Sequence, residues 1–222
     1  MLPIRPSVAG RFEKSWAEVA GHGAWWSAAE RHAMVAELRH ASACRMCSVR
    51  AEALSPNSVE GEHESLGFLA DAVVDVIHRM RTDSGRLTRA WFDSIVPDQI
   101  SPEAYVEIVG VVGTVMVMDT WATAMQMTLK KMSPAAIGEP TREASLPVTD
   151  AGAWVPILDV GAHDRGVNPN IFRSLALAPS ARELFLSTFS QHYMLQDMRL
   201  ELERPQIELI ASRVSALNQC FY

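Results

Sequence analysis

The sequence predicts an almost entirely α-helical protein, because it carries clear helix-start patterns and no strand patterning. Ser27 and Glu30 form an S-x-x-E capping box ahead of an alanine-rich run. Ser101 precedes Pro102 and Glu103, which is typical of an N-cap followed by the first turn of a helix. No two segments alternate apolar and polar residues in a way that predicts neighbouring strands. The expected fold class is therefore all-α.

Helical spacing of apolar residues predicts the other elements of the first half. The capped helix is expected to run to about Ala43, and a second helix is expected over Leu69–Met80. A turn and a short helix follow within residues 81–95. The stretch that opens at Ser101 is rich in β-branched residues, which would also suit a buried strand. Its length and its start signals favour a buried helix.

Helical patterning returns in the last quarter of the chain. Asn168 or Asn170 is a candidate cap, and Pro179 marks a break between two helices. Pro205 lies in the first turn of the final predicted helix. We expect that helix to turn one apolar stripe toward the core, made of Ile207, Ile210, Val214 and Leu217.

The distribution of Pro, Gly and Thr suggests two helical units. Residues 1–135 form the first expected unit, which contains Cys44 and Cys47, and residues 154–222 form the second. Between them, residues 136–153 lack periodicity and are expected to be a linker or an arm that packs on a neighbouring subunit.

Composition and charge exclude several classes of partner. The chain has 222 residues, of which 48% are hydrophobic and 21% charged, so it is long enough for a sizeable core. Its formal net charge of −6 argues against nucleic acid and against a membrane surface as partners. The N-terminus lacks the apolar core of a secretory signal, and the apolar stretch Ile108–Met118 is too short to span a bilayer. We therefore expect a cytoplasmic protein without a membrane partner.

Cysteine usage points to chemistry rather than to a disulfide scaffold. The chain has three cysteines, and two of them form Cys44-x-x-Cys47, a spacing that usually serves metal binding or thiol chemistry. His63, with Glu62 and Glu64 beside it, supplies a third candidate zinc ligand. The fourth ligand of such a site is not assigned by the sequence. His78 lies between Ile77 and Arg79 and is expected to be a structural histidine.

A second candidate site lies near the C-terminus. Glu208 precedes Cys220 by twelve residues, and its helical neighbours include small residues. Partial burial would raise the pKa of the Glu208 carboxyl group and make it a general base that could generate a cysteine thiolate. The alternative is a solvated surface glutamate and a cysteine that only packs.

Two segments resemble the alkyl hydroperoxidase D-like, carboxymuconolactone decarboxylase-like family. The segment PNIFRSLALAPSARELFLSTF with LERPQIELIASRVSALNQC resembles the earlier half of the family pattern. The segment AVVDVIHRMRTDSGRLTRAWFDSIVPDQISPEAYVEIVGVVGTVMVMDTWATAM resembles its later half. The resemblance implies a multi-helix alkyl hydroperoxidase D-like fold with two related half-units.

The resemblance also implies roles for individual residues. Glu208 matches the acid of a proton relay and Cys220 matches a resolving cysteine, while the attacking cysteine and its histidine would follow Tyr222. At the first pair, Cys44 and Cys47 are both present, with His32 where the relay acid is expected. Ala51 stands where the histidine is expected, so the candidates to replace these groups in space are Glu37, Glu52 and His63.

The function that the resemblance implies is a thiol-dependent peroxidase or thiol-disulfide oxidoreductase of the antioxidant type. Such a protein needs no flavin, haem or metal, acts on a peroxide or another small molecule, and takes electrons from a disulfide-reducing protein partner. The resemblance further implies a homo-oligomer, a trimer or a hexamer, whose interface Ile108–Met118 would suit. The alternatives are a non-catalytic helical oligomeric scaffold and a zinc-binding protein that uses Cys44 and Cys47.

Overall fold

The computed structural model describes residues 4–161, 170–191 and 202–217, and within these ranges the protein is mostly helical. This confirms the all-α fold class. The helices are α1 (Pro6–Val19), α2 (Ala28–His40), α3 (Arg45–Glu52), α4 (Asp71–Thr82), α5 (Arg89–Asp93), α6 (Pro102–Ala124), α7 (Asn170–Arg173), α8 (Pro179–Phe189) and α9 (Arg204–Leu217), with 3-10 turns at Ala41–Ala43, Pro56–Ser58 and Ser84–Arg86.

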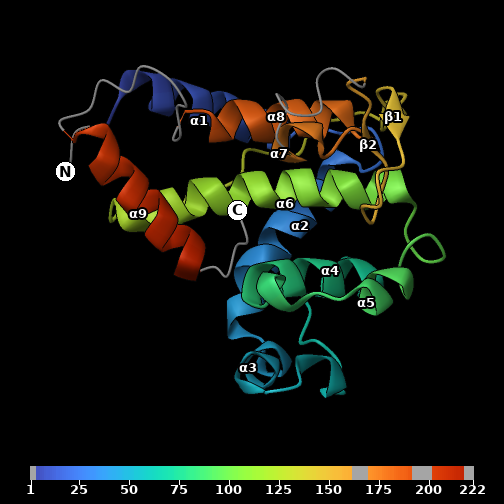
Figure 1. Ribbon diagram of the computed structural model, residues 1–222. Coiled ribbons are helices and arrows are strands. Elements are labelled where there is room, and N and C mark those ends of the chain that lie inside the picture. Colours follow the sequence, from blue (N-terminus) through green and yellow to red (C-terminus); the bar gives the residue numbers. More distant parts are fainter. Residues whose placement is uncertain (1–3, 162–169, 192–201, 218–222) are drawn as a thin grey trace.

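The long helix α6 is the central element (Figure 1). Helices α1 and α8 pack along one side of it, and α2 and α4 pack on another. Helix α3 lies at the far end of α2, away from α1 and α8 (Figure 1). The cysteine pair is therefore held in a peripheral lobe, which is connected to the core through α2 and α4.

Local sequence signals explain where the two best-marked helices begin. The Ser27 hydroxyl accepts a hydrogen bond from the Glu30 backbone N–H, and the Glu30 carboxylate accepts one from the Ser27 backbone N–H, which completes the capping box. The Ser101 hydroxyl caps α6 by accepting from the Ala104 N–H. Both predicted starts are confirmed. Helix α1, which has Pro6 in its first turn, was not anticipated from the sequence.

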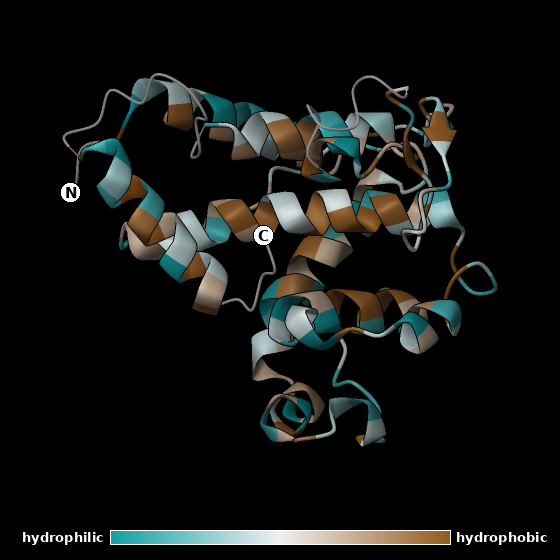
Figure 2. Cartoon of the chain, viewed as in Figure 1, coloured by the Kyte–Doolittle hydropathy of each residue, from teal (hydrophilic) through white to brown (hydrophobic). Residues whose placement is uncertain are grey.

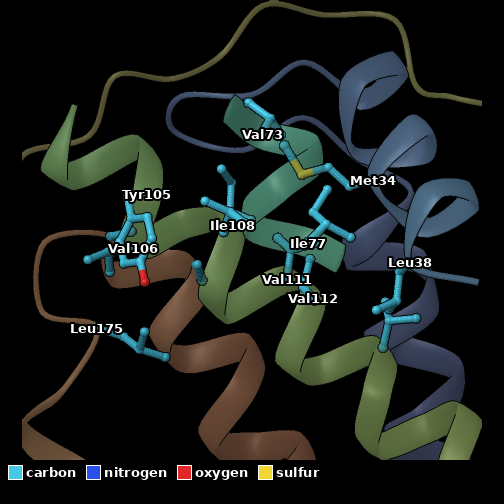
Figure 3. Packing of buried hydrophobic residues seen from close by; sticks show 14 of the residues in the cluster. Met34, Leu38, Val73, Ile77, Tyr105, Val106, Ile108, Val111, Val112 and Leu175 are labelled. Atoms are coloured by element: carbon cyan, nitrogen blue, oxygen red, sulfur yellow. The ribbon is translucent and has the colours of Figure 1, made fainter. Parts of the chain in front are cut away.

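The core is built around α6, which carries apolar residues on much of its circumference (Figure 2). Ile108, Val111 and Val112 of α6 face Met34 of α2 and Ile77 of α4 (Figure 3), and all five are nearly inaccessible to solvent. Burial of each such side chain stabilises the fold by about 1.5–3 kcal/mol. Most residues of the apolar stretch Ile108–Met118 are thus buried by the chain's own helices, and its part in a subunit interface stays a prediction.

Helix α6 is also long and apolar enough, by length and composition, to cross a membrane. Core helices of soluble proteins pass the same test, and 56% of its most apolar window is buried inside the fold. A buried ion pair adds to this tertiary packing, because Arg31 of α2 donates two hydrogen bonds to Glu107 of α6, at 2.9 and 2.7 Å. Removing one partner of such a pair leaves a buried charge uncompensated.

Two expectations about the second half need revision. The expectation of no strand pair was wrong, because Val148–Thr149 pairs antiparallel with Ile157–Leu158. Residues 136–153, which were expected to be a linker or an arm, hydrogen-bond to the same chain, since the Ala136 N–H donates to Ala20 and the Leu146 N–H donates to Ala176; their role as a linker or an arm stays a prediction. One hydrophobic cluster also includes residues from both expected units.

The second revision concerns the last helix. The stripe on α9 was expected to face the core, but no residue of α9 is buried. Ile210, Val214 and Leu217 are each more than half exposed. The spacing of these residues correctly predicted an amphipathic helix, but spacing alone does not specify whether the apolar side packs against the same chain.

The contact between α6 and α8 leads to a prediction about two glycines. A Cβ atom added at Gly110 would lie 2.9 Å from the Ala181 Cβ and 3.0 Å from its carbonyl oxygen, whereas one added at Gly10 of α1 meets nothing within 4 Å. Gly110→Ala should therefore destabilise the protein by about 1–3 kcal/mol. Gly10→Ala should stabilise it by about 0.5–1 kcal/mol through helix propensity. Urea unfolding of both variants checks the opposite signs, and stabilisation by Gly110→Ala would contradict the close packing.

Candidate metal centre

Four side chains converge at the junction of α3, α4 and the segment between them. The sulfur atoms of Cys44 and Cys47 and one ring nitrogen from each of His63 and His78 all lie within 4.8 Å of one another. Both cysteines are unpaired thiols, and each residue is only 1% exposed. Two sulfur and two nitrogen donors in a buried cluster are a typical ligand set for zinc.

Local structure positions the two sulfur atoms. After α2, a 3-10 turn redirects the chain, and Cys44 is the extended N-cap residue of α3 with φ −68° and ψ 123°. Cys47 follows in the first turn of α3, three residues later, so the two side chains lie on the same face of the helix. The Cys-x-x-Cys spacing therefore places both thiols toward α4.

The two histidines come from different kinds of element. His78 is in the middle of α4 and is fully buried. His63 lies between the turn Pro56–Ser58 and α4, in a segment without regular secondary structure. The two rings pack edge to face with centroids 4.4 Å apart. The site thus joins three segments that are separated along the chain.

Three of the six distances between the donor atoms are close to the edges of a zinc tetrahedron, and the other three are within 4.8 Å. With Zn–S near 2.3 Å and Zn–N near 2.0–2.1 Å, neighbouring sulfur and nitrogen ligands should be about 3.5 Å apart. The Nδ1 atom of His63 lies 3.4 Å from the Cys47 sulfur and 3.7 Å from the Cys44 sulfur. The Nδ1 atom of His78 lies 3.2 Å from the Cys47 sulfur. An ion at the centre would fit with only small shifts of these side chains.

A carboxylate fixes the orientation of each imidazole. The Nε2 atom of His78 is 2.8 Å from the Glu37 carboxylate, and that of His63 is 2.8 Å from the Asp75 carboxylate. Each Nε2 therefore carries the proton that it donates, which leaves Nδ1 free to bind a metal. The second oxygen of Glu37 accepts the Leu66 backbone N–H at 3.0 Å, so Glu37 also anchors the segment that follows His63.

Asp75 lies at the centre of a wider polar network. Its Oδ2 atom accepts a hydrogen bond from the Trp91 indole at 2.6 Å, and its Oδ1 atom accepts one from Arg79 at 3.1 Å. Burial raises the pKa of the Asp75 carboxyl group, but hydrogen bonds from His63 and Trp91 and the charge of Arg79 lower it well below its usual range. Asp75 is therefore a carboxylate at neutral pH.

Shifted pKa values accompany this geometry. Burial lowers the pKa of His63, but its hydrogen bond to Asp75 and its contacts with the two thiols outweigh burial and raise that pKa to about 10. Burial raises the pKa of the Cys44 thiol, but hydrogen bonds from the Cys47 backbone and from His63 bring it below its ordinary value. For His78, burial lowers the pKa despite the bond to Glu37. Without a metal, His63 thus carries a proton next to the sulfur atoms.

Of the four donors, one also borders a cavity. A cavity of about 540 Å³ is lined by His63 and Asp75, and by Arg50 and Met46 of α3. Neither cysteine lines it. The two buried sulfur atoms therefore do not border this cavity, while His63 does.

The structure brings together only some of the residues that the sequence singled out. Cys44, Cys47 and His63 meet as the zinc alternative required, and Glu37 supports them. His78 was expected to be a structural histidine, and its full burial and its bond to Glu37 agree with that, but its Nδ1 atom also makes it the fourth candidate donor of the group. Its position between apolar helical neighbours gave no sequence signal of this role.

The other sequence candidates lie outside this cluster. Glu52 is exposed at the end of α3, and His32 is not among the grouped donors. Glu208 is in α9, far from α3 in Figure 1, where its carboxylate is 43% exposed and pairs with Arg204. Cys220 lies outside the described residues.

Comparison of the chain with protein-family models, with curated proteins and with solved structures found no match. The site must therefore be interpreted from its own geometry.

The His63–Asp75 pair predicts the pH dependence of the metal-free protein. The pKa of His63 is about 10 in the folded state and about 6.5 when unfolded, so the pair stabilises the fold fully below pH 6.5 and loses this contribution as pH rises toward 10. His63→Gln should therefore destabilise the metal-free protein at pH 6 by more than about 1 kcal/mol, and by progressively less at higher pH. Urea unfolding between pH 6 and pH 10 measures the difference.

His40→Gln is the matched control, because the His40 Nε2 atom bonds to a backbone carbonyl, that of Glu64, at the same lobe instead of to a carboxylate. Its effect should vary much less over that pH range. A His63→Gln effect that is constant with pH would contradict the proposed charged pair.

Proposed function

We propose that this protein binds one zinc ion through Cys44, Cys47, His63 and His78, and that the ion holds the peripheral lobe to the helical core. The observation that carries the proposal is the orientation of the donors. Both imidazoles direct Nδ1 toward the two sulfur atoms, and both keep Nε2 on a carboxylate. This arrangement is typical of histidine ligands that are supported by an outer hydrogen-bond partner.

The chemistry of the donor set favours zinc over other cations. Thiolate and imidazole are the ligands that zinc takes at structural sites, while calcium and magnesium prefer oxygen. Two thiolates neutralise the charge of a divalent ion, which suits a site with almost no solvent contact. The zinc would supply strong bonds in the peripheral lobe, where few large apolar side chains are buried.

The packing of α3 explains why the lobe would need an ion. Its buried residues are Cys47 and Arg50, so α3 buries no large aliphatic side chain. An isolated helix of this length is unstable in water. Ligands from α3, from the segment before α4 and from α4 itself would be cross-linked by a single ion. Metal binding would then contribute directly to the folding of this lobe.

Metal removal gives the first test of the proposal. A chelator should lower the melting temperature and should raise amide hydrogen exchange in residues 45–66, with little change in α6 and α8. Cys47→Ser and His78→Ala should lose about one equivalent of zinc per chain and show the same exchange pattern. Mass spectrometry under native conditions and hydrogen exchange measure the two effects.

His40→Gln again serves as the matched control and should retain the metal, because His40 is not one of the converging donors. Purified wild-type protein that holds no zinc after growth in zinc-containing medium, and takes up none on titration, would refute the zinc proposal.

A second candidate function is thiol-disulfide or peroxide chemistry, favoured by one specific chain of contacts. Glu37 accepts from His78 Nε2 at 2.8 Å, and His78 Nδ1 lies 3.2 Å from the Cys47 sulfur. A carboxylate, an imidazole and a thiol in this order can generate a thiolate. Cys47 would then attack a peroxide and release an alcohol, and Cys44 would displace water from the resulting sulfenic acid to form a disulfide.

This second candidate agrees with the family resemblance and would require a disulfide-reducing protein partner. It involves Cys47 and Cys44 instead of Glu208 and Cys220. The near-complete burial of both sulfur atoms favours the zinc proposal, because a peroxide must reach the attacking sulfur.

A peroxide pulse distinguishes the two candidates. If zinc binding is the function, the metal-loaded protein should keep Cys44 and Cys47 reduced, while the metal-free protein should form their disulfide more than about tenfold faster. Thiol counting by peptide mass spectrometry measures this ratio. Fast and repeated turnover of peroxide by metal-free protein with a dithiol reductant, at an unchanged melting temperature, would instead favour the oxidoreductase.

A further inference from the structure

We propose that His63 is an exchangeable ligand, and that a small cationic thiol can enter the neighbouring cavity and replace it on the metal. This inference rests on the proposed zinc site. The site would then be a receptor for aminothiols as well as a structural cross-link, with three fixed ligands and one that can leave.

The four donors differ in how firmly the fold holds them. Cys44 and Cys47 belong to the start of α3, and His78 belongs to the middle of α4. His63 lies in a segment without regular secondary structure, and its side chain is 9% exposed, whereas the other three residues are 0–1% exposed. Detaching His63 would therefore disturb less packing than detaching any other donor.

The same residue forms the wall of the cavity. Among the four donors, only His63 lines the cavity of about 540 Å³, and apolar side chains of Val59 and Val74 line it as well. This volume lies within the range of sites that hold small organic molecules. If the His63 ring moved away, the vacated position on the metal would face the cavity, and a set of two cysteines and one histidine is also found at catalytic zinc sites with an open position.

The charges around the cavity select the ligand. Exposed carboxylates of Glu60, Glu62 and Asp71 line it, and their combined charge is negative. Arg50 lines the cavity too, but that residue is only 2% exposed. A molecule that enters the cavity would therefore have little direct contact with its guanidinium group. A ligand with a cationic group is therefore favoured. A thiol is the matching metal-binding group, because this donor set already prefers sulfur.

The exchange balances in charge and atoms without a redox step. The incoming thiol loses its proton as its sulfur binds the metal, and the departing Nδ1 atom of His63 takes up that proton. The resulting imidazolium stays beside the Asp75 carboxylate, which already lies 2.8 Å from its Nε2 atom. The metal keeps four ligands, of which three are then thiolates.

The test uses the full-length protein loaded with cobalt(II), whose visible spectrum reports thiolate ligation. Cysteamine is the cationic probe, 2-mercaptoethanol the neutral one and mercaptoacetate the anionic one. Cysteamine should add a sulfur-to-cobalt charge-transfer band while the metal stays with the protein after gel filtration. It should bind at least about tenfold more tightly than mercaptoacetate.

Two variants refine this test. His63→Ala should still bind cobalt and should bind cysteamine about tenfold more tightly than the wild type does, because no ligand has to leave. The double variant Glu62→Gln, Asp71→Asn should weaken cysteamine binding several-fold and leave 2-mercaptoethanol binding unchanged.

The outcomes separate this inference from the zinc proposal. A cobalt-loaded wild type with cysteine-to-cobalt bands that do not respond to millimolar cysteamine would overturn the exchange and leave the metal centre intact. Loss of cobalt without a ternary species would overturn it as well, as would equal affinity for the three thiols. A wild type that shows no cysteine-to-cobalt bands would overturn both proposals.

Discussion

The peripheral lobe depends on the way two carboxylates orient two imidazoles. Glu37 and Asp75 each hold an Nε2 atom at 2.8 Å, and this constraint directs both Nδ1 atoms toward the cysteine sulfurs. Without these two hydrogen bonds, the two imidazoles would be buried beside the two thiols without partners for their Nε2 atoms, at a high cost in free energy. The proposed zinc ion would instead form four bonds that join α3, α4 and the intervening segment.

The helical core makes that constraint possible. Glu37 is on α2 and Asp75 is on α4, and these two helices pack against each other and against α6. The buried pair between Arg31 and Glu107 fixes α2 on α6 at the other end of the same helix. The carboxylates are thus presented by helices, while His63 is presented by a segment without regular secondary structure. This difference is the physical basis for treating His63 as the replaceable ligand.

Sequence patterns predicted the parts of this structure that local interactions determine. The capping box at Ser27, the cap at Ser101 and the close pairing of Cys44 and Cys47 depend on residues a few positions apart. The position of His78 beside the two sulfur atoms was not predicted, because it depends on how α4 packs on α2 and α3. The stripe on α9 was predicted as a core face but is exposed, since periodicity does not identify the partner of an apolar face. The resemblance to alkyl hydroperoxidase D-like proteins stays a prediction.

The central claim is that two thiolates and two imidazoles bind a single zinc ion, and X-ray absorption spectroscopy at the zinc edge tests it most directly. Protein purified without added metal or chelator should contain about one zinc per chain, with two sulfur ligands near 2.3 Å and two nitrogen ligands near 2.0–2.1 Å. A first shell made only of oxygen and nitrogen would contradict the account. Protein that is purified without zinc and takes up none on titration would contradict it equally.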